Sequence, residues 1–196
     1  LIVNPDYAEK NNLHSLYLAR EHLSNAYVIP CDIWCDQSPF RRHELYSWYM
    51  VSDLVDNDSS VRVNRKLELT TISASSGGNS MVGISYLLSK DARVIQERLE
   101  RYDKDPAYAD KFWEETLYEK GKMIVPAKVV HAANIVEINT FEQLRELDSN
   151  SNHLQSDVLE IAAKALHTHP EDISNITVLK KGMTNPSFLF DCNCCK

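Results

Sequence analysis

The sequence predicts an α/β fold, because segments with helical periodicity alternate with short apolar runs of strand length. Apolar residues recur at helical spacing from Leu13 to Leu23, and an apolar run follows at residues 26–31. Of the 196 residues, 43% are hydrophobic and 25% are charged, which is typical of a globular domain with a sizeable core.

The N-terminal segment is expected to form a strand–helix–strand unit. Residues 1–4 have the composition of a strand end, and Asn11 or Asn12 can cap the helix that follows. The apolar run at residues 26–31 has the length of a buried parallel strand, so Asp32 is expected at its C-terminal end. In open α/β sheets, ligands bind at that edge.

The rest of the first 148 residues is expected to contain antiparallel strands followed by helices. Strands are predicted near residues 46–52, 60–63, 66–73, 81–88 and 128–138. Helices are predicted at residues 89–101, with Ser89 as the cap, and at residues 108–119. Thr140 and Gln143 are typical of a capping box at the start of a helix at residues 141–147.

A change of composition predicts a domain boundary near residue 148. Residues 149–155 are polar and unpatterned, as in a linker. Residues 156–166 are amphipathic, and residues 173–181 and 187–191 are predicted to be two strands of a hairpin. Because residues 156–196 are too few for a free-standing core, they are interpreted as the beginning of a second domain.

Charge, hydropathy and cysteine usage exclude several classes of protein. The net charge of −7 argues against a nucleic-acid-binding surface. The absence of a long apolar run argues against membrane insertion, and no signal peptide is visible, so a cytoplasmic location is expected. Five cysteines without framework spacing favour free thiols over a zinc site. His14 and His22 are expected on the exposed side of the first helix.

Three segments carry a resemblance to a known family. They read NPDYA at residues 4–8 with NNLHSLYL at 11–18, AYVIPCD at 26–32, and VEINTFEQL at 136–144. GISY at 83–86 and FWEE at 112–115 also fit. In order and spacing these segments resemble bacterial CTP:phosphocholine cytidylyltransferases over roughly residues 1–148. The resemblance implies a Rossmann-like nucleotidyltransferase sheet, mixed and mainly parallel, with antiparallel strands forming the acceptor pocket.

The resemblance also implies roles for single residues. Asp32 and Asn139 would hold Mg²⁺, although relatives often have aspartate at the second position. Asn12 and Ser15 would approach the base and ribose of CTP, and the choline group would lie among Tyr86, Trp113, Glu114 and Glu137. Trp48 and Tyr49 are further candidates. Without the resemblance, loop and helix capping explain Asp32 and Asn139, and aromatic residues at such spacing are more often part of a core.

The final segment resembles a different family. VLKKGMTN at residues 178–185, followed by SFLF at 187–190, resembles the nucleotide-binding hairpin at the start of bacterial choline kinases, where Thr184 and Asn185 would lie over ATP. The rest of such a kinase would follow Lys196. The glycine-rich loop that holds the CTP phosphates in the cytidylyltransferase family would precede Leu1, so the chain alone is not expected to be a competent enzyme.

Three functions remain open at this point. The first is synthesis of CDP-choline and pyrophosphate from CTP and phosphocholine, in a protein that also carries choline kinase activity. The second keeps the fold but uses another phosphorylated amine or a sugar phosphate as the acceptor. The third is a non-catalytic module that tethers the adjoining kinase domain.

Overall fold

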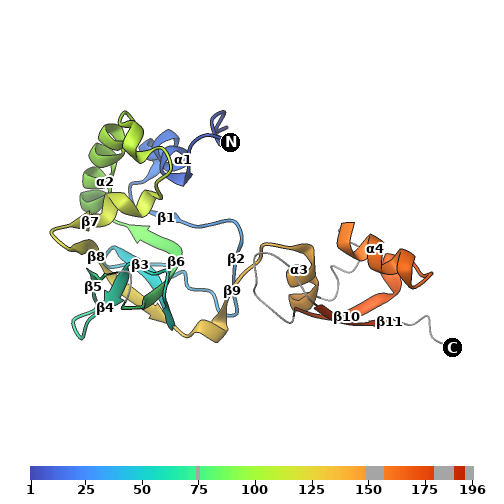
Figure 1. The fold of residues 1–196 in the computed structure, drawn as a ribbon. Helices are drawn as coiled ribbons and strands as arrows, with labels where there is room; N and C mark the ends of the chain where they lie inside the picture. Colours follow the sequence, from blue (N-terminus) through green and yellow to red (C-terminus); the bar gives the residue numbers. More distant parts are fainter. Residues whose placement is uncertain (74–75, 149–156, 179–187, 193–196) are drawn as a thin grey trace. The chain divides into compact units, whose positions relative to one another are not determined.

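The computed structural model describes residues 1–73, 76–148, 157–178 and 188–192. The chain divides into two compact units, Leu1–Val136 and Glu137–Lys196, each of which is described by itself (Figure 1). This boundary lies twelve residues before the one predicted at residue 148. The difference arises because the buried Arg145 donates a hydrogen bond of 2.6 Å to the carbonyl of Ile173 and so joins the second unit. The predicted linker at residues 149–155 lies outside the described residues.

A seven-stranded sheet forms the centre of the first unit, in the order β1-β6-β3-β8-β5-β4, with β7 paired to β8. Its strands are β1 (Ala26–Val28), β3 (Trp48–Asp56), β4 (Val61–Val63), β5 (Glu68–Thr71), β6 (Gly78–Leu87), β7 (Tyr118–Glu119) and β8 (Lys122–Val130). Within this sheet, β3 and β8 are the only described neighbours that run parallel, so the prediction of a mainly parallel sheet is wrong. Parallel neighbours need long crossover connections, whereas a short turn joins β4 to β5.

The predicted strand at residues 26–31 is shorter than expected. β1 ends at Val28, because Pro30 cannot donate a hydrogen bond to a strand ladder. β1 pairs antiparallel with β6, and residues 1–4 form no strand, so residues 1–31 do not form the predicted strand–helix–strand unit. Asp32 therefore lies in a turn before β2 (Ile33–Cys35) rather than at the end of a parallel strand.

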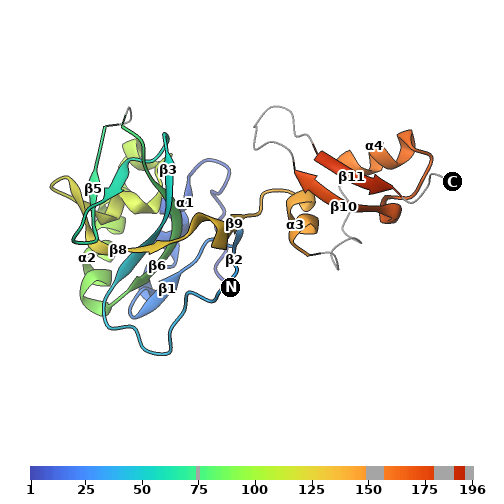
Figure 2. The same cartoon turned by 90° about the horizontal axis from the view of Figure 1, so that it is seen from below.

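Two helices cover one face of this sheet (Figures 1 and 2). They are α1 (Asn12–Leu18) and α2 (Ser89–Tyr102), which buries Ala92, Ile95 and Leu99. The core between them and the sheet includes Tyr49 and Trp113. The cap residue of α2 is Leu88 rather than Ser89, because the Ser89 hydroxyl is paired with the hydroxyl of Ser24 at 2.9 Å.

The helix predicted at residues 108–119 is absent. The segment forms the 3₁₀ turns η2 (Pro106–Tyr108) and η3 (Trp113–Leu117), followed by β7. The cause is a contact distant in sequence: the amide of Trp113 donates a hydrogen bond of 2.8 Å to Asn12 Oδ1 instead of to a helical carbonyl. A bond across 101 residues cannot be predicted from local periodicity.

The opposite face of the sheet carries a second cluster, formed by Trp48, Met50, Val82 and Ile84. Successive residues of a strand point to opposite faces, which separates Trp48 from its neighbour Tyr49. A short two-stranded sheet accompanies this unit, formed by β2 and β9 (Ile135–Glu137). Short 3₁₀ turns occur at η1 (Arg20–His22) and η4 (Ala132–Asn134). No described helix of the chain is long and apolar enough to cross a membrane.

The second unit contains α3 (Phe141–Leu147), α4 (Asp157–Ala165), the turn η6 (Pro170–Asp172) and the antiparallel pair β10 (Ile173–Val178) and β11 (Phe188–Cys192). The capping box of Thr140 and Gln143 is confirmed, with both of its hydrogen bonds present. The two predicted strands of the hairpin are also confirmed. Thr184 and Asn185 lie outside the described residues, so the kinase resemblance stays a prediction.

The prediction that all five cysteines are free thiols is wrong. Cys31 and Cys35 are free, but Cys192 is disulfide-bonded. An odd number of cysteines requires only that one thiol stays unpaired, and it does not exclude a bridge among the others.

Candidate functional site

A hollow of about 240 Å³ lies in the first unit, between α1, the end of β1 and the start of η3. It is lined by Asn12, Ser15, Leu16, Val28, Ile29, Pro30 and Trp113. Three of the predicted site residues, Asn12, Ser15 and Trp113, are therefore brought together, although Trp113 lies about one hundred positions after the other two. Asp32 follows Pro30 by two residues.

Asn12 connects two walls of the hollow. Its Oδ1 accepts the hydrogen bond from the Trp113 amide, and its Nδ2 has no hydrogen-bond partner among the described residues. Capping does not explain Asn12, because Asn11 is the cap of α1 and accepts from the Asn12 amide at 2.7 Å. The free Nδ2 group can therefore donate to a ligand in the hollow.

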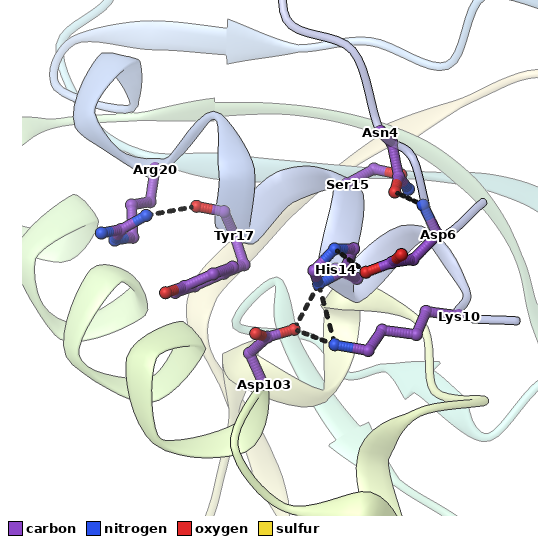
Figure 3. A network of polar contacts seen from close by, with 8 residues as sticks. All are labelled: Asn4, Asp6, Lys10, His14, Ser15, Tyr17, Arg20 and Asp103. Atoms are coloured by element: carbon purple, nitrogen blue, oxygen red, sulfur yellow. Dashed lines mark hydrogen bonds and ion pairs between the residues drawn. The ribbon is translucent and has the colours of Figure 1, made fainter.

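Ser15 is held in place by the preceding turn. Its Oγ accepts a hydrogen bond of 2.9 Å from Asn4 Nδ2, and Asn4 Oδ1 accepts the amide of Asp6 at 2.9 Å (Figure 3). Because the hydroxyl uses its oxygen as the acceptor, its proton remains available to a ligand.

His14 anchors the other side of α1. The prediction that it is exposed is wrong: its exposed fraction is 6%, whereas His22 is exposed as predicted. His14 Nδ1 lies 2.5 Å from Asp103 Oδ1, and Nε2 lies 3.4 Å from Asp6 Oδ2 (Figure 3). Lys10 Nζ is 3.5 Å from the same oxygen of Asp103. The helical pattern of this segment did not indicate that His14 is buried. The burial of His14 depends on carboxylates that other parts of the chain supply.

Trp113 is only 4% exposed and packs its ring 6.0 Å from that of Tyr49. The Tyr49 hydroxyl donates a hydrogen bond of 2.9 Å to Glu114 Oε1, and the other oxygen of Glu114 is buried without a hydrogen-bond partner. Burial raises the pKa of Glu114, since its charged form loses solvation, and the hydrogen bond from Tyr49 opposes this only in part. Burial also raises the pKa of Tyr49 well above its ordinary value, and the nearby Glu114 charge adds to this.

A bulge in β6 lies against Pro30, one of the residues that line the hollow. Tyr49 faces Ser85 and Val51 faces Met81, so β6 has two more residues than β3 in this interval. Gly83 lies in the bulge with φ +85°, and a Cβ atom there would lie 2.7 Å from Pro30 Cγ. The close approach of β6 to Pro30 therefore requires glycine.

The two predicted magnesium ligands lie in different units. The carboxylate of Asp32 is half-buried and has no hydrogen bond or ion pair within the described part of the chain. Asn139 is exposed; its amide donates to Gln143 Oε1 at 2.7 Å, and its side chain has no described partner. A free carboxylate and a free amide oxygen suit Mg²⁺, which takes few protein ligands and keeps substrate phosphates in its shell. No group of three histidine, cysteine or acidic residues that could hold a metal ion occurs in the described ranges.

Comparisons with known proteins show a similarity of sequence and fold. The chain is 26% identical over 152 residues to choline-phosphate cytidylyltransferase of Streptococcus pneumoniae, covering 76% of the chain and 66% of that protein. A solved structure of CTP:phosphocholine cytidylyltransferase from the same species superimposes with a TM-score of 0.61 at 23% identity, over 75% of this chain and 66% of that one. The fold is similar to that of a cytidylyltransferase.

A second relative is 2-aminoethylphosphonate cytidylyltransferase of Lancefieldella rimae, 24% identical over 163 residues, covering 76% of this chain and 63% of that protein. The chain thus spans slightly less than two thirds of the length of both relatives. No known protein-family profile matches the chain.

Within the first unit, Tyr86 and Trp113 lie in different clusters of the core. Tyr86 packs against the Trp48 cluster, with its ring 4.8 Å from that of Tyr27, whereas Trp113 belongs to the core on the opposite face. Tyr27 was missed by the sequence analysis. It meets Tyr86 because β1 and β6 pair in a register that places the two residues opposite each other. Glu137, the last residue of β9, is exposed in the second unit.

Proposed function

We propose that this chain takes part in the transfer of a cytidylyl group from CTP to phosphocholine, which gives CDP-choline and pyrophosphate. One observation carries the proposal: Asn12, Ser15 and Trp113 line a single hollow. Pro30 also lines this hollow and precedes Asp32 by two residues. Similarity to two cytidylyltransferases supports the same assignment. The proposed place of action is the cytoplasm, where CTP is available.

In this reaction a phosphate oxygen of the acceptor forms a bond to the α-phosphorus of CTP, and the bond from that phosphorus to the bridging oxygen breaks. Pyrophosphate leaves with the electron pair of the broken bond. The acceptor phosphate is already anionic near neutral pH, so no dedicated general base is needed. The protein must instead position the two phosphates in line and compensate their charge.

Different residues would bind the nucleotide and hold the cation. Asn12 Nδ2 and the Ser15 hydroxyl, both free to donate, would bind the cytosine and ribose of CTP. Asp32 and Asn139 would hold Mg²⁺, which compensates phosphate charge when it is bound. The assignment of this pair rests on the resemblance and on their free oxygen atoms.

A second acceptor class is favoured by one specific comparison, the similarity to a 2-aminoethylphosphonate cytidylyltransferase. A quaternary ammonium cannot donate a conventional hydrogen bond and needs aromatic faces, whereas a primary amine can donate to carboxylates. Parallel assays of phosphocholine, phosphoethanolamine and 2-aminoethylphosphonate would rank the acceptors by their values of kcat/KM.

The deciding experiment measures pyrophosphate release from CTP and phosphocholine by the full-length protein carrying this sequence. Asp32→Asn is expected to lower kcat/KM by on the order of 100-fold or more, because it removes the charge that holds the cation. Asp36→Asn is the matched control, since this exposed residue lies four positions further on. If Asp32→Asn turns over CTP as fast as the control, Asp32 has no part in the reaction. No turnover with any acceptor would favour a non-catalytic role.

A further inference from the structure

A second hollow lies on the other face of the sheet, beside the segment that leads into β3. Its volume is about 310 Å³, and its lining includes Arg41, His43, Glu44, Trp48 and Lys128. It shares no residue with the hollow that contains Asn12 and Trp113. The reaction proposed above assigns no role to it.

Arg41 and Lys128 outnumber the one carboxylate of the lining, and neither forms an ion pair within the described residues. Arg41, His43 and Lys128 form no ion pair within the described part of the chain, and the side chain of Arg41 has no hydrogen bond there. The one acidic residue, Glu44, accepts a hydrogen bond of 2.9 Å from the Tyr27 hydroxyl. Arg41 and Lys128 therefore share the lining with one carboxylate, which also acts on Lys128.

Trp48 provides an independent sign of a missing acceptor. The residue is 1% exposed, and its indole Nε1 is buried without a hydrogen-bond partner. A buried donor without an acceptor lowers the stability of the folded state. Lys128 Nζ lies 4.0 Å from the centre of the Trp48 ring and donates to the carbonyl of Pro39 at 2.5 Å, so its ammonium is fixed beside the indole.

The backbone of Arg41 is held in place by a contact with β1. Its amide donates to the Tyr27 hydroxyl at 3.2 Å, which ties the segment to β1. Burial lowers the pKa of Lys128; the charge of Glu44 opposes this, and the smaller effect of Arg41 lowers the pKa further.

We propose that this second hollow binds the phosphate group of a small ligand, held by Arg41 and Lys128. A phosphate offers several acceptor oxygens, which match an arginine fork and neighbouring donors better than a single carbonyl does. The shared chemistry is the phosphate group, which either free phosphate or a phosphate monoester can supply. The inference does not depend on cytidylyl transfer.

Calorimetric titration of the protein with inorganic phosphate and with glycerol phosphate, in the absence of CTP, tests this inference. Saturable binding is expected for at least one of them, against a chloride control of equal ionic strength. Tighter binding of glycerol phosphate would assign an organic monoester, and tighter binding of inorganic phosphate would assign the free ion. Because no turnover is measured, failure here leaves the proposed activity untouched, and the reverse also holds.

Two neighbouring arginines give a matched pair of variants. Arg41 lines the hollow, whereas Arg42 is equally exposed but does not line it. Arg41→Ala is expected to weaken phosphate binding by on the order of tenfold, the scale of a charge-assisted hydrogen bond, and Arg42→Ala by less than about twofold. Lys128→Gln should weaken it as Arg41→Ala does. Equal losses in the two arginine variants would show general surface attraction, and that result, like an absence of saturable binding, would overturn the assignment.

Discussion

His14 Nδ1 and Asp103 Oδ1 are 2.5 Å apart although 89 residues separate them in the sequence. A contact this short requires a proton between the two atoms, so Nδ1 is the donor; it then cannot accept from Lys10 Nζ, which lies 3.3 Å from Nδ1 and 3.5 Å from Asp103 Oδ1. The contact joins the start of α1 to the residue that follows α2. It thereby holds the helix that carries Asn12 and Ser15 into the hollow.

Substitution of His14 should reveal which of its two carboxylate contacts matters more. His14→Ala leaves the carboxylate of Asp103 without its closest partner and is expected to lower the free energy of unfolding by about 2–4 kcal/mol. Asparagine can place an amide near the Nδ1 position and glutamine near the Nε2 position. His14→Asn should therefore be the more stable of the two in urea denaturation. His22→Ala, at an exposed position, is the control and should change stability little.

The pKa of Glu114 predicts how stability depends on pH. Because burial raises this pKa, the folded protein keeps a proton that the unfolded chain loses above about pH 4.3. The contribution of Glu114 is thus fully present below that pH and is lost as the pH rises through the raised value. Glu114→Gln cannot titrate, so its free energy of unfolding should increase relative to wild type between pH 4 and pH 8.

The magnitude and the control of this measurement follow from the same relation. Each unit by which the pKa is raised corresponds to about 1.4 kcal/mol of lost stability once both states are ionised. Glu97→Gln on the exposed face of α2 should show no such trend. A difference between Glu114→Gln and wild type that stays constant with pH would mean that the carboxyl is not desolvated.

Gly83 and Gly121 form a matched pair for testing the bulge in β6. Both have positive φ, +85° and +80°, but an added Cβ would lie 2.7 Å from Pro30 Cγ at Gly83 and 3.5 Å from Thr71 Oγ1 at Gly121. Gly121→Ala should therefore lower the free energy of unfolding by about 1–2 kcal/mol from backbone strain alone. Gly83→Ala should lower it by about 1–3 kcal/mol more, because of the steric overlap.

A double substitution separates overlap from strain at Gly83. If contact with the proline ring causes the extra loss, Gly83→Ala combined with Pro30→Ala should recover it in urea denaturation. Additive effects of the two substitutions would show that the contact with Pro30 is not the reason for glycine in the bulge.

The parts of the fold that local signals determine were predictable from the sequence. The capping box of Thr140 and Gln143 and the amphipathic pattern of α2 each depend on residues within a few turns of helix. The direction of strand pairing depends on which segments meet in space, so the short antiparallel β1 was not predictable. The same limit applies to the segment beginning at Trp113, where a bond from its amide to Asn12 prevails over a helical pattern.

The site, like the fold, was predicted only in part from the sequence. The resemblance selected Asn12, Ser15 and Trp113 from segments distant in sequence, and these residues line one hollow. It did not reveal that Tyr86 would pack with Tyr27 on the other face, because such pairing depends on strand register rather than on residue type. Contacts fixed by register or by a bulge are not encoded within one short segment.

Trp113 is better tested by phenylalanine than by alanine. Its ring is 4% exposed and packs in the core, so Trp113→Ala is expected to lower the free energy of unfolding by about 3–5 kcal/mol and would confuse loss of folding with loss of binding. Trp113→Phe keeps an aromatic ring, and the backbone bond to Asn12 Oδ1 does not involve the side chain. If the indole contacts a quaternary ammonium, kcat/KM for phosphocholine should fall several-fold in this variant while that for 2-aminoethylphosphonate changes little, since the cation–π attraction of tryptophan exceeds that of phenylalanine. Equal losses for the two acceptors, with unchanged urea denaturation, would assign Trp113 to the core alone.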